Sequence, residues 1–93
     1  MTTSKSPLRV LKKQAESIAQ MLKAAERGDP VADPTGSIAD ARKNSDGVKF
    51  GIIMDDKFIS AEMTWAQIRE SSEVAITEWI LRYMRDQRRE ATH

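Results

Sequence analysis

The sequence predicts a small α+β fold, in which an N-terminal helix and a linker precede a β-hairpin that packs against a C-terminal helical segment. Apolar residues recur at helical spacing over residues 7–27, alternate over much of 48–63 and return to helical spacing over 65–89. A chain of 93 residues is at most one domain. Because only 5% of its residues are aromatic, the core is thin, and we expect dimerisation to complete the fold.

The first element is an amphipathic helix over residues 7–27, preceded by a disordered tail at 1–6. Pro7 suits the first helical position, and Gly28 supplies a stop. Six residues form an apolar seam along the helix: Leu8, Leu11, Ala15, Ile18, Leu22 and Ala25. The seam either covers the hairpin of its own chain or pairs with a second helix from another copy or a partner.

Residues 28–47 are predicted to form a linker, because they contain two of the three prolines and three of the four glycines. A short helical turn is expected at 38–43. A loop of this length inside a compact domain would be unusual, so the first helix is expected to be tethered to a hairpin–helix unit at 48–90.

The hairpin has strands at about 48–54 and 58–63, joined by a turn at Asp55 and Asp56. With Met54 opposite Lys57, one face carries only apolar residues: Val48, Phe50, Ile52, Ile59, Ala61 and Met63. The other face pairs Lys49 with Glu62, Gly51 with Ser60, and Ile53 with Phe58. Slippage by one residue would disrupt both faces, so this register is favoured. Both strand edges are expected to be unpaired, and therefore available to another chain or to the first helix.

Thr64 and Gln67 form a capping-box pattern at the start of the C-terminal helical segment, at about 65–89. Its apolar arc includes both tryptophans, Trp65 and Trp79, which are expected in the core. Val74 and Leu81 fall on the opposite side.

The seam of the first helix, the Ile53–Phe58 pair and the Val74–Leu81 pair could each contact another chain. They favour a non-catalytic protein–protein interaction module that forms a homodimer and binds an unknown protein partner. The candidate interface residues are Leu8, Leu11, Ile18, Leu22, Ile53, Phe58, Val74 and Leu81.

The alternative is a nucleic-acid-binding regulatory protein. The first helix is basic, since residues 1–27 hold six Lys/Arg against two Glu. Four arginines also form a stripe near the end of the last helix, at Arg82, Arg85, Arg88 and Arg89. Cations at a helix C-terminus also complement its dipole, so we do not favour this function over the first.

The composition gives little basis for catalysis. The chain has no cysteine and a single histidine, His93, so it lacks thiolate ligands and offers no histidine base beside a serine or threonine. We expect no enzyme activity, no metal and no cofactor. No apolar run approaches a membrane span, and the first residues lack signal-peptide features, which indicates a cytoplasmic, bacterial protein.

Overall fold

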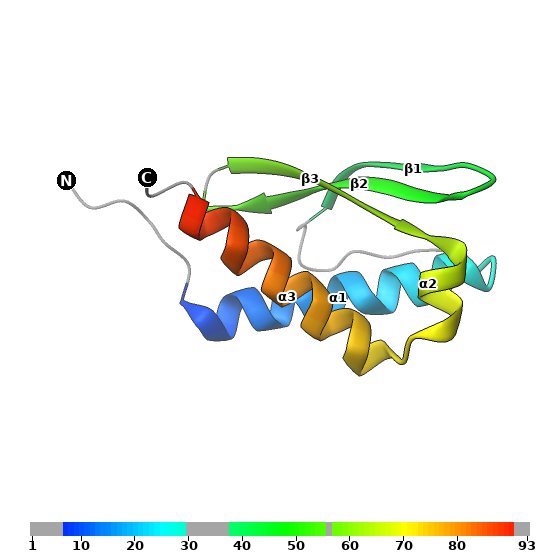
Figure 1. The fold of residues 1–93 in the computed structure, drawn as a ribbon, viewed down its shortest axis with the longest axis horizontal. Helices are drawn as coiled ribbons and strands as arrows, with labels where there is room; N and C mark the ends of the chain where they lie inside the picture. Colours follow the sequence, from blue (N-terminus) through cyan, green and yellow to red (C-terminus); the bar gives the residue numbers. More distant parts are fainter. Residues whose placement is uncertain (1–6, 30–37, 56, 91–93) are drawn as a thin grey trace.

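The structure of the chain, a computed structural model, describes residues 7–29, 38–55 and 57–90. The elements follow the order α1 (Leu8–Glu26), β1 (Ile38–Lys43), β2 (Gly47–Met54), β3 (Lys57–Thr64), α2 (Trp65–Glu70) and α3 (Glu73–Glu90). The strands form one antiparallel sheet, and α1 and α3 lie together beneath it (Figure 1). This confirms the α+β class. The tail predicted at 1–6 lies outside the described residues.

Helix α1 begins directly after Pro7 and ends before Gly28, whose φ of 81° only glycine adopts without strain. The central part of its apolar seam packs inside its own chain, because Leu11, Ile18 and Leu22 are each at most 1% exposed. The helix packs against α3 in a shared core and does not form the separate tethered arm that the sequence predicts. Packing of the seam against the same chain is therefore the arrangement adopted.

Residues 38–43 form strand β1, so their assignment to a linker with a short helical turn is wrong. The strand pairs antiparallel with β2, with Arg42 opposite Lys49 and an irregularity in the register between Ala39 and Arg42. An isolated six-residue helix is marginal in water, whereas the edge of β2 offers unpaired backbone groups to a neighbour. One of the two hairpin edges predicted to be free is therefore occupied.

A turn at Asn44 joins β1 to β2. The Asn44 side-chain oxygen accepts from the backbone N–H groups of Asp46 and Gly47, at 2.8 and 3.0 Å. This local bonding is characteristic of asparagine in turns. These hydrogen bonds stabilise the reversal of the chain between β1 and β2.

The predicted β2–β3 register is confirmed, with Ile53 opposite Phe58, Gly51 opposite Ser60 and Lys49 opposite Glu62. Asp55, in the turn, has a φ of 52°, a conformation that aspartate tolerates better than most residues. The inner face is buried at Val48, Phe50 and Ile52, and it meets the apolar faces of α1 and α3. The outer face is open to solvent.

The capping box at α2 is confirmed, since Thr64 and Gln67 satisfy each other's backbone N–H groups. Ser71 and Ser72 separate α2 from α3, and the buried apolar face of α3 includes Ile76, Ile80 and Met84. The placement of Trp79 in the core is wrong. Its side chain lies at the border of the buried arc, on the flank of α3, and it is 36% exposed. Trp65 is half-buried against the core.

Polar contacts fix the helices to each other and to the sheet. The Lys23 ammonium donates to the backbone carbonyl of Ile68 at 2.7 Å, and Arg69 pairs with Glu26 at 3.1 Å. Arg88 forms a two-point ion pair with Asp55 at 2.8 and 2.9 Å. None of the helices in the described ranges is long and apolar enough to cross a membrane.

Candidate interaction groove

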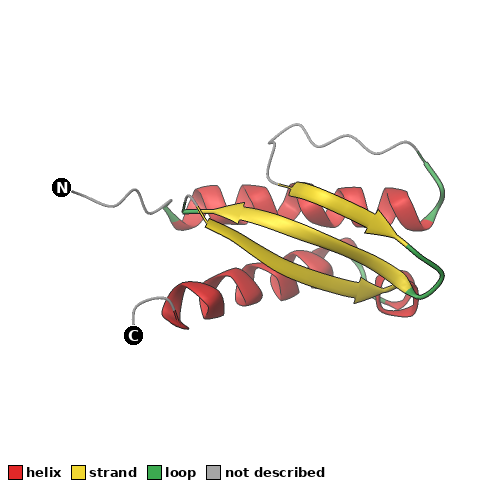
Figure 2. Cartoon of the chain, turned by 90° about the horizontal axis from the view of Figure 1, so that it is seen from above, coloured by secondary structure: helices red, strands yellow, loops and turns green. Residues whose placement is uncertain are grey.

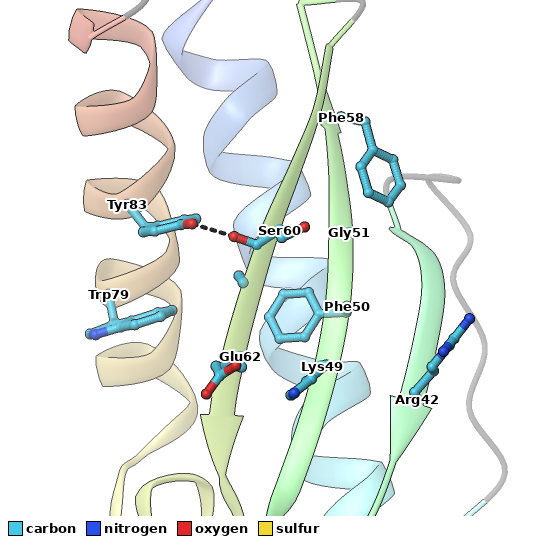
Figure 3. Close-up of a pocket in the computed structure, with 10 residues that line it drawn as sticks. Arg42, Lys49, Phe50, Gly51, Phe58, Ser60, Glu62, Trp79 and Tyr83 are labelled. Atoms are coloured by element: carbon cyan, nitrogen blue, oxygen red, sulfur yellow. Dashed lines mark hydrogen bonds between the residues drawn. The ribbon is translucent and has the colours of Figure 1, made fainter.

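An open groove of about 540 Å³ runs along β3 on the side that faces α3 and continues onto the outer face of the sheet (Figure 3). We call it the β3 groove. The residues that define it here are Trp79 and Tyr83 from α3, Phe58, Ser60 and Glu62 from β3, and Arg42, Lys49 and Gly51 from the other strands.

The aromatic wall of the groove is a stack of two rings on α3. The ring centroids of Trp79 and Tyr83 are 5.6 Å apart, and the ring planes differ by 3°. Residues four apart on a helix lie one turn above each other, which sets up this stack. Trp79 is one of the exposed large apolar side chains of the described chain, whereas Tyr83 is half-buried against the core.

The opposite wall is the outer edge of β3, the last strand in the sheet order. In an antiparallel pair, backbone groups point alternately toward and away from the partner strand. The Tyr83 hydroxyl donates to the backbone carbonyl of Ser60 on this edge. The backbone groups of Ser60, and by alternation those of Phe58 and Glu62, therefore point away from β2 and into the groove.

On the outer face of the sheet, Gly51 and Ser60 are opposite each other, and their small side chains leave a shallow depression. A Cβ atom on Gly51 would overlap the tip of the Phe58 ring, so this ring lies directly over the glycine. Phe58 nevertheless remains 53% exposed. The ring therefore fills the hollow over β2 and leaves the part over Ser60 open to the aromatic wall.

Three charged residues cross the outer face in one row, with Arg42 on β1, Lys49 on β2 and Glu62 on β3. All three are exposed, and the ion pairs of the described residues do not include them. Glu62 stands on the edge strand, so its outer side is available to a charge on a neighbouring strand.

The interface residues predicted from the sequence do not lie together in the structure. Leu11, Ile18 and Leu22 are core residues, whereas Leu8 is 53% exposed. Leu81 is partly buried against the core.

Val74 is 67% exposed at the start of α3, whereas Arg88, near the other end, contacts the turn beside Ile53 and Phe58. The two positions on α3 are separated by about 21 Å at ~1.5 Å per residue. Val74 and the Ile53–Phe58 pair therefore do not belong to one continuous surface patch.

The arginine stripe is also divided. Arg88 is held by Asp55, with its side chain 22% exposed. Arg82 and Arg85 are exposed beside the carboxylates of Glu78 and Asp86. The helix includes Arg89, whose side chain lies outside what the structure describes. The two arginines that remain on the surface thus share it with acids, which weakens the field that a phosphate backbone would meet.

Sequence reasoning identified Phe58 in this surface but missed Trp79, Tyr83 and the backbone edge of β3. Trp79 and Tyr83 lie four residues apart at one border of the apolar arc of α3, and this placement is the feature of the sequence that could have indicated an aromatic pair on the flank. A tryptophan at such a border can face the core or the flank, and only the width of the sheet above it decides which.

No protein-family model matches the chain, and the searches of curated proteins and of solved structures found no match. Among the residues that the structure describes, no cluster of three His, Cys, Asp or Glu side chains could hold a metal ion.

Proposed function

We propose that the chain is a non-catalytic protein–protein interaction module that binds its partner in the β3 groove. The observation that carries this proposal is the stack of the exposed Trp79 on the half-buried Tyr83, beside the outer edge of β3. Aromatic side chains contribute much of the binding energy at protein interfaces, and an unpaired strand edge supplies hydrogen bonds to a partner backbone.

The chemistry of the groove supports binding better than catalysis. Its side chains are mainly aromatic, hydroxylic and cationic, and Glu62 is its single carboxylate. General acid–base catalysis needs a group whose proton affinity is matched to the reaction and that faces a bound substrate. Glu62 is exposed on an open sheet face, where solvent surrounds it.

The experiment is a selection of displayed random peptides against the intact chain, followed by binding measurements with Trp79→Ala. We expect selected peptides to bind the variant at least ~10-fold more weakly, because aromatic residues at the centre of an interface contribute about 2 kcal/mol or more. Val74→Ala is the matched control, since Val74 is an exposed apolar residue of the same helix outside the groove. Peptides that bind Trp79→Ala as tightly as the parent chain would contradict the proposal.

The homodimer remains a prediction. Of the surfaces expected to form it, the central part of the α1 seam is buried in its own chain. The exposed candidates are Leu8, Ile53, Phe58 and Val74. The mass of the chain by light scattering, measured over a range of concentrations, decides whether two copies associate.

A further inference from the structure

Resting on the proposed function, we infer that the occupant of the β3 groove is an extended segment of another protein, added antiparallel to β3 as a fourth strand. It carries apolar residues over Trp79 and Tyr83 and a lysine or arginine opposite Glu62.

The dimensions of the two layers leave room for this strand. Three strands at about 4.8 Å spacing cover roughly 14 Å, whereas two packed helices cover about 20 Å. The difference is close to the width of one strand. Seen from above, α3 lies along the outer side of β3 (Figure 2). The aromatic wall is thus the part of α3 that the three-stranded sheet leaves uncovered.

A side chain already makes one of the hydrogen bonds that a fourth strand would make with the edge of β3. The Tyr83 hydroxyl donates to the Ser60 carbonyl, the bond that a backbone N–H of an added strand would make. An incoming strand replaces this hydroxyl and also reaches the outward backbone groups of Phe58 and Glu62. Antiparallel addition continues the pairing of the existing sheet.

The side chains along β3 determine which sequence fits. Residues opposite Glu62, Ser60 and Phe58 lie on the outer face, because opposite residues share a face. The side chains that fit opposite Glu62, Ser60 and Phe58 are a cation, a small polar residue and an apolar residue, in that order. The two residues between them are opposite Ala61 and Ile59, point toward the helices, and meet the Trp79 and Tyr83 rings as apolar side chains (Figure 3).

A second copy of β3 does not meet these requirements. Its outer-face residues are Phe58, Ser60, Glu62 and Thr64, none of which is a cation. Since opposite residues share a face, every antiparallel register of two β3 strands leaves Glu62 without an opposite charge. The two-fold copy would also bring its own α3 against the α3 that flanks the groove. The charge of the edge therefore favours a different chain.

The probe is a peptide with the core Arg-Val-Thr-Val-Phe, capped at both ends and flanked by Gly and Ser, titrated against the intact chain by calorimetry. We expect binding, with slower hydrogen exchange at the amides of Phe58, Ser60 and Glu62. Methylating the backbone nitrogen of the threonine, which faces Ser60, should weaken binding at least ~10-fold, because it removes the hydrogen bond and inserts a methyl group between the strands. Methylation at the first valine, whose N–H faces away from β3, is the control, and its effect should stay below ~2-fold.

The charge is tested by exchange. A peptide with glutamate in place of arginine should bind about 5-fold more weakly, and Glu62→Lys should reverse this preference. Tyr83→Phe should bind the parent peptide at least as tightly, since the peptide supplies the bond that the hydroxyl makes.

The outcomes separate this inference from the proposed function. Three results would each overturn strand addition. The first is equal weakening by the two methyl groups, the second is a continued preference of Glu62→Lys for the arginine peptide, and the third is weaker binding of the parent peptide by Tyr83→Phe. If displayed peptides still required Trp79 after such a result, the proposed interaction module would stand and only strand addition would be rejected. If neither the designed peptide nor any displayed peptide bound, both would be rejected.

Discussion

At the scale of single residues, the role of a charged side chain depends on the partner that the fold brings to it. Arg88 looks like one of four equivalent cations in the sequence. In the structure it reaches Asp55, a turn residue whose side chain is only 11% exposed. A two-point pair between guanidinium and carboxylate is stronger than a single contact, and partial burial reduces its screening by water.

The ion pair gives a prediction about stability. Arg88→Ala should lower the free energy of unfolding by about 1–2 kcal/mol, because it leaves the Asp55 carboxylate without its two-point partner. Arg85→Ala, an exposed site on the same helix, should change it by less than ~0.5 kcal/mol. Urea unfolding followed by circular dichroism measures both. Equal effects at the two positions would show that the pair with Asp55 is not a specific source of stability.

At the scale of the elements, periodicity identifies which face of a helix is apolar but not what covers that face. The α1 seam has the spacing of a short coiled coil, yet its central residues pack into their own chain. Burial in the chain's own core is favourable because the linked elements lose less translational freedom than two separate chains. The residue at the start of the seam, Leu8, lies beyond this core.

A paired substitution tests the packing of this helix. Leu11→Ala should destabilise the fold by about 2–4 kcal/mol, since it removes a fully buried side chain and leaves a cavity. Leu8→Ala, at an exposed position of the same helix, should cost less than ~1 kcal/mol. The free energies come from denaturant titrations at several protein concentrations. A larger loss at Leu8 would mean that the seam is buried between chains.

At the scale of the whole molecule, the core is shared by segments far apart in the sequence. Ile18 and Leu22 of α1 join Ile52 of the sheet and Ile80 and Met84 of α3 in one cluster. The hairpin–helix unit predicted at 48–90 therefore lacks part of its core and the strand β1. Burial of apolar side chains is the main stabilising contribution to folding, so the shared cluster makes the described elements interdependent.

This interdependence predicts that a chain starting at residue 48 does not fold alone. Without α1 and β1, the inner face of β2 and the buried arc of α3 lose their main cover. We expect weak near-ultraviolet circular dichroism and no cooperative thermal transition, in contrast to a single transition for the full chain. Addition of a peptide with the sequence of α1 provides a complementation control. A cooperative transition in the truncated chain would contradict the shared core.

The sequence by itself determined the α+β class, the β2–β3 register and the start of α2, because each rests on neighbouring residues. Alternating side chains set the faces of the hairpin, and Thr64 and Gln67 satisfy local backbone groups. Tertiary structure alone decided that residues 38–43 complete the edge of β2, that α1 packs in its own chain, and that Trp79 and Tyr83 stand beside the edge of β3. These features depend on the relative widths of two layers and on backbone groups that every residue carries, which the order of side chains does not reveal.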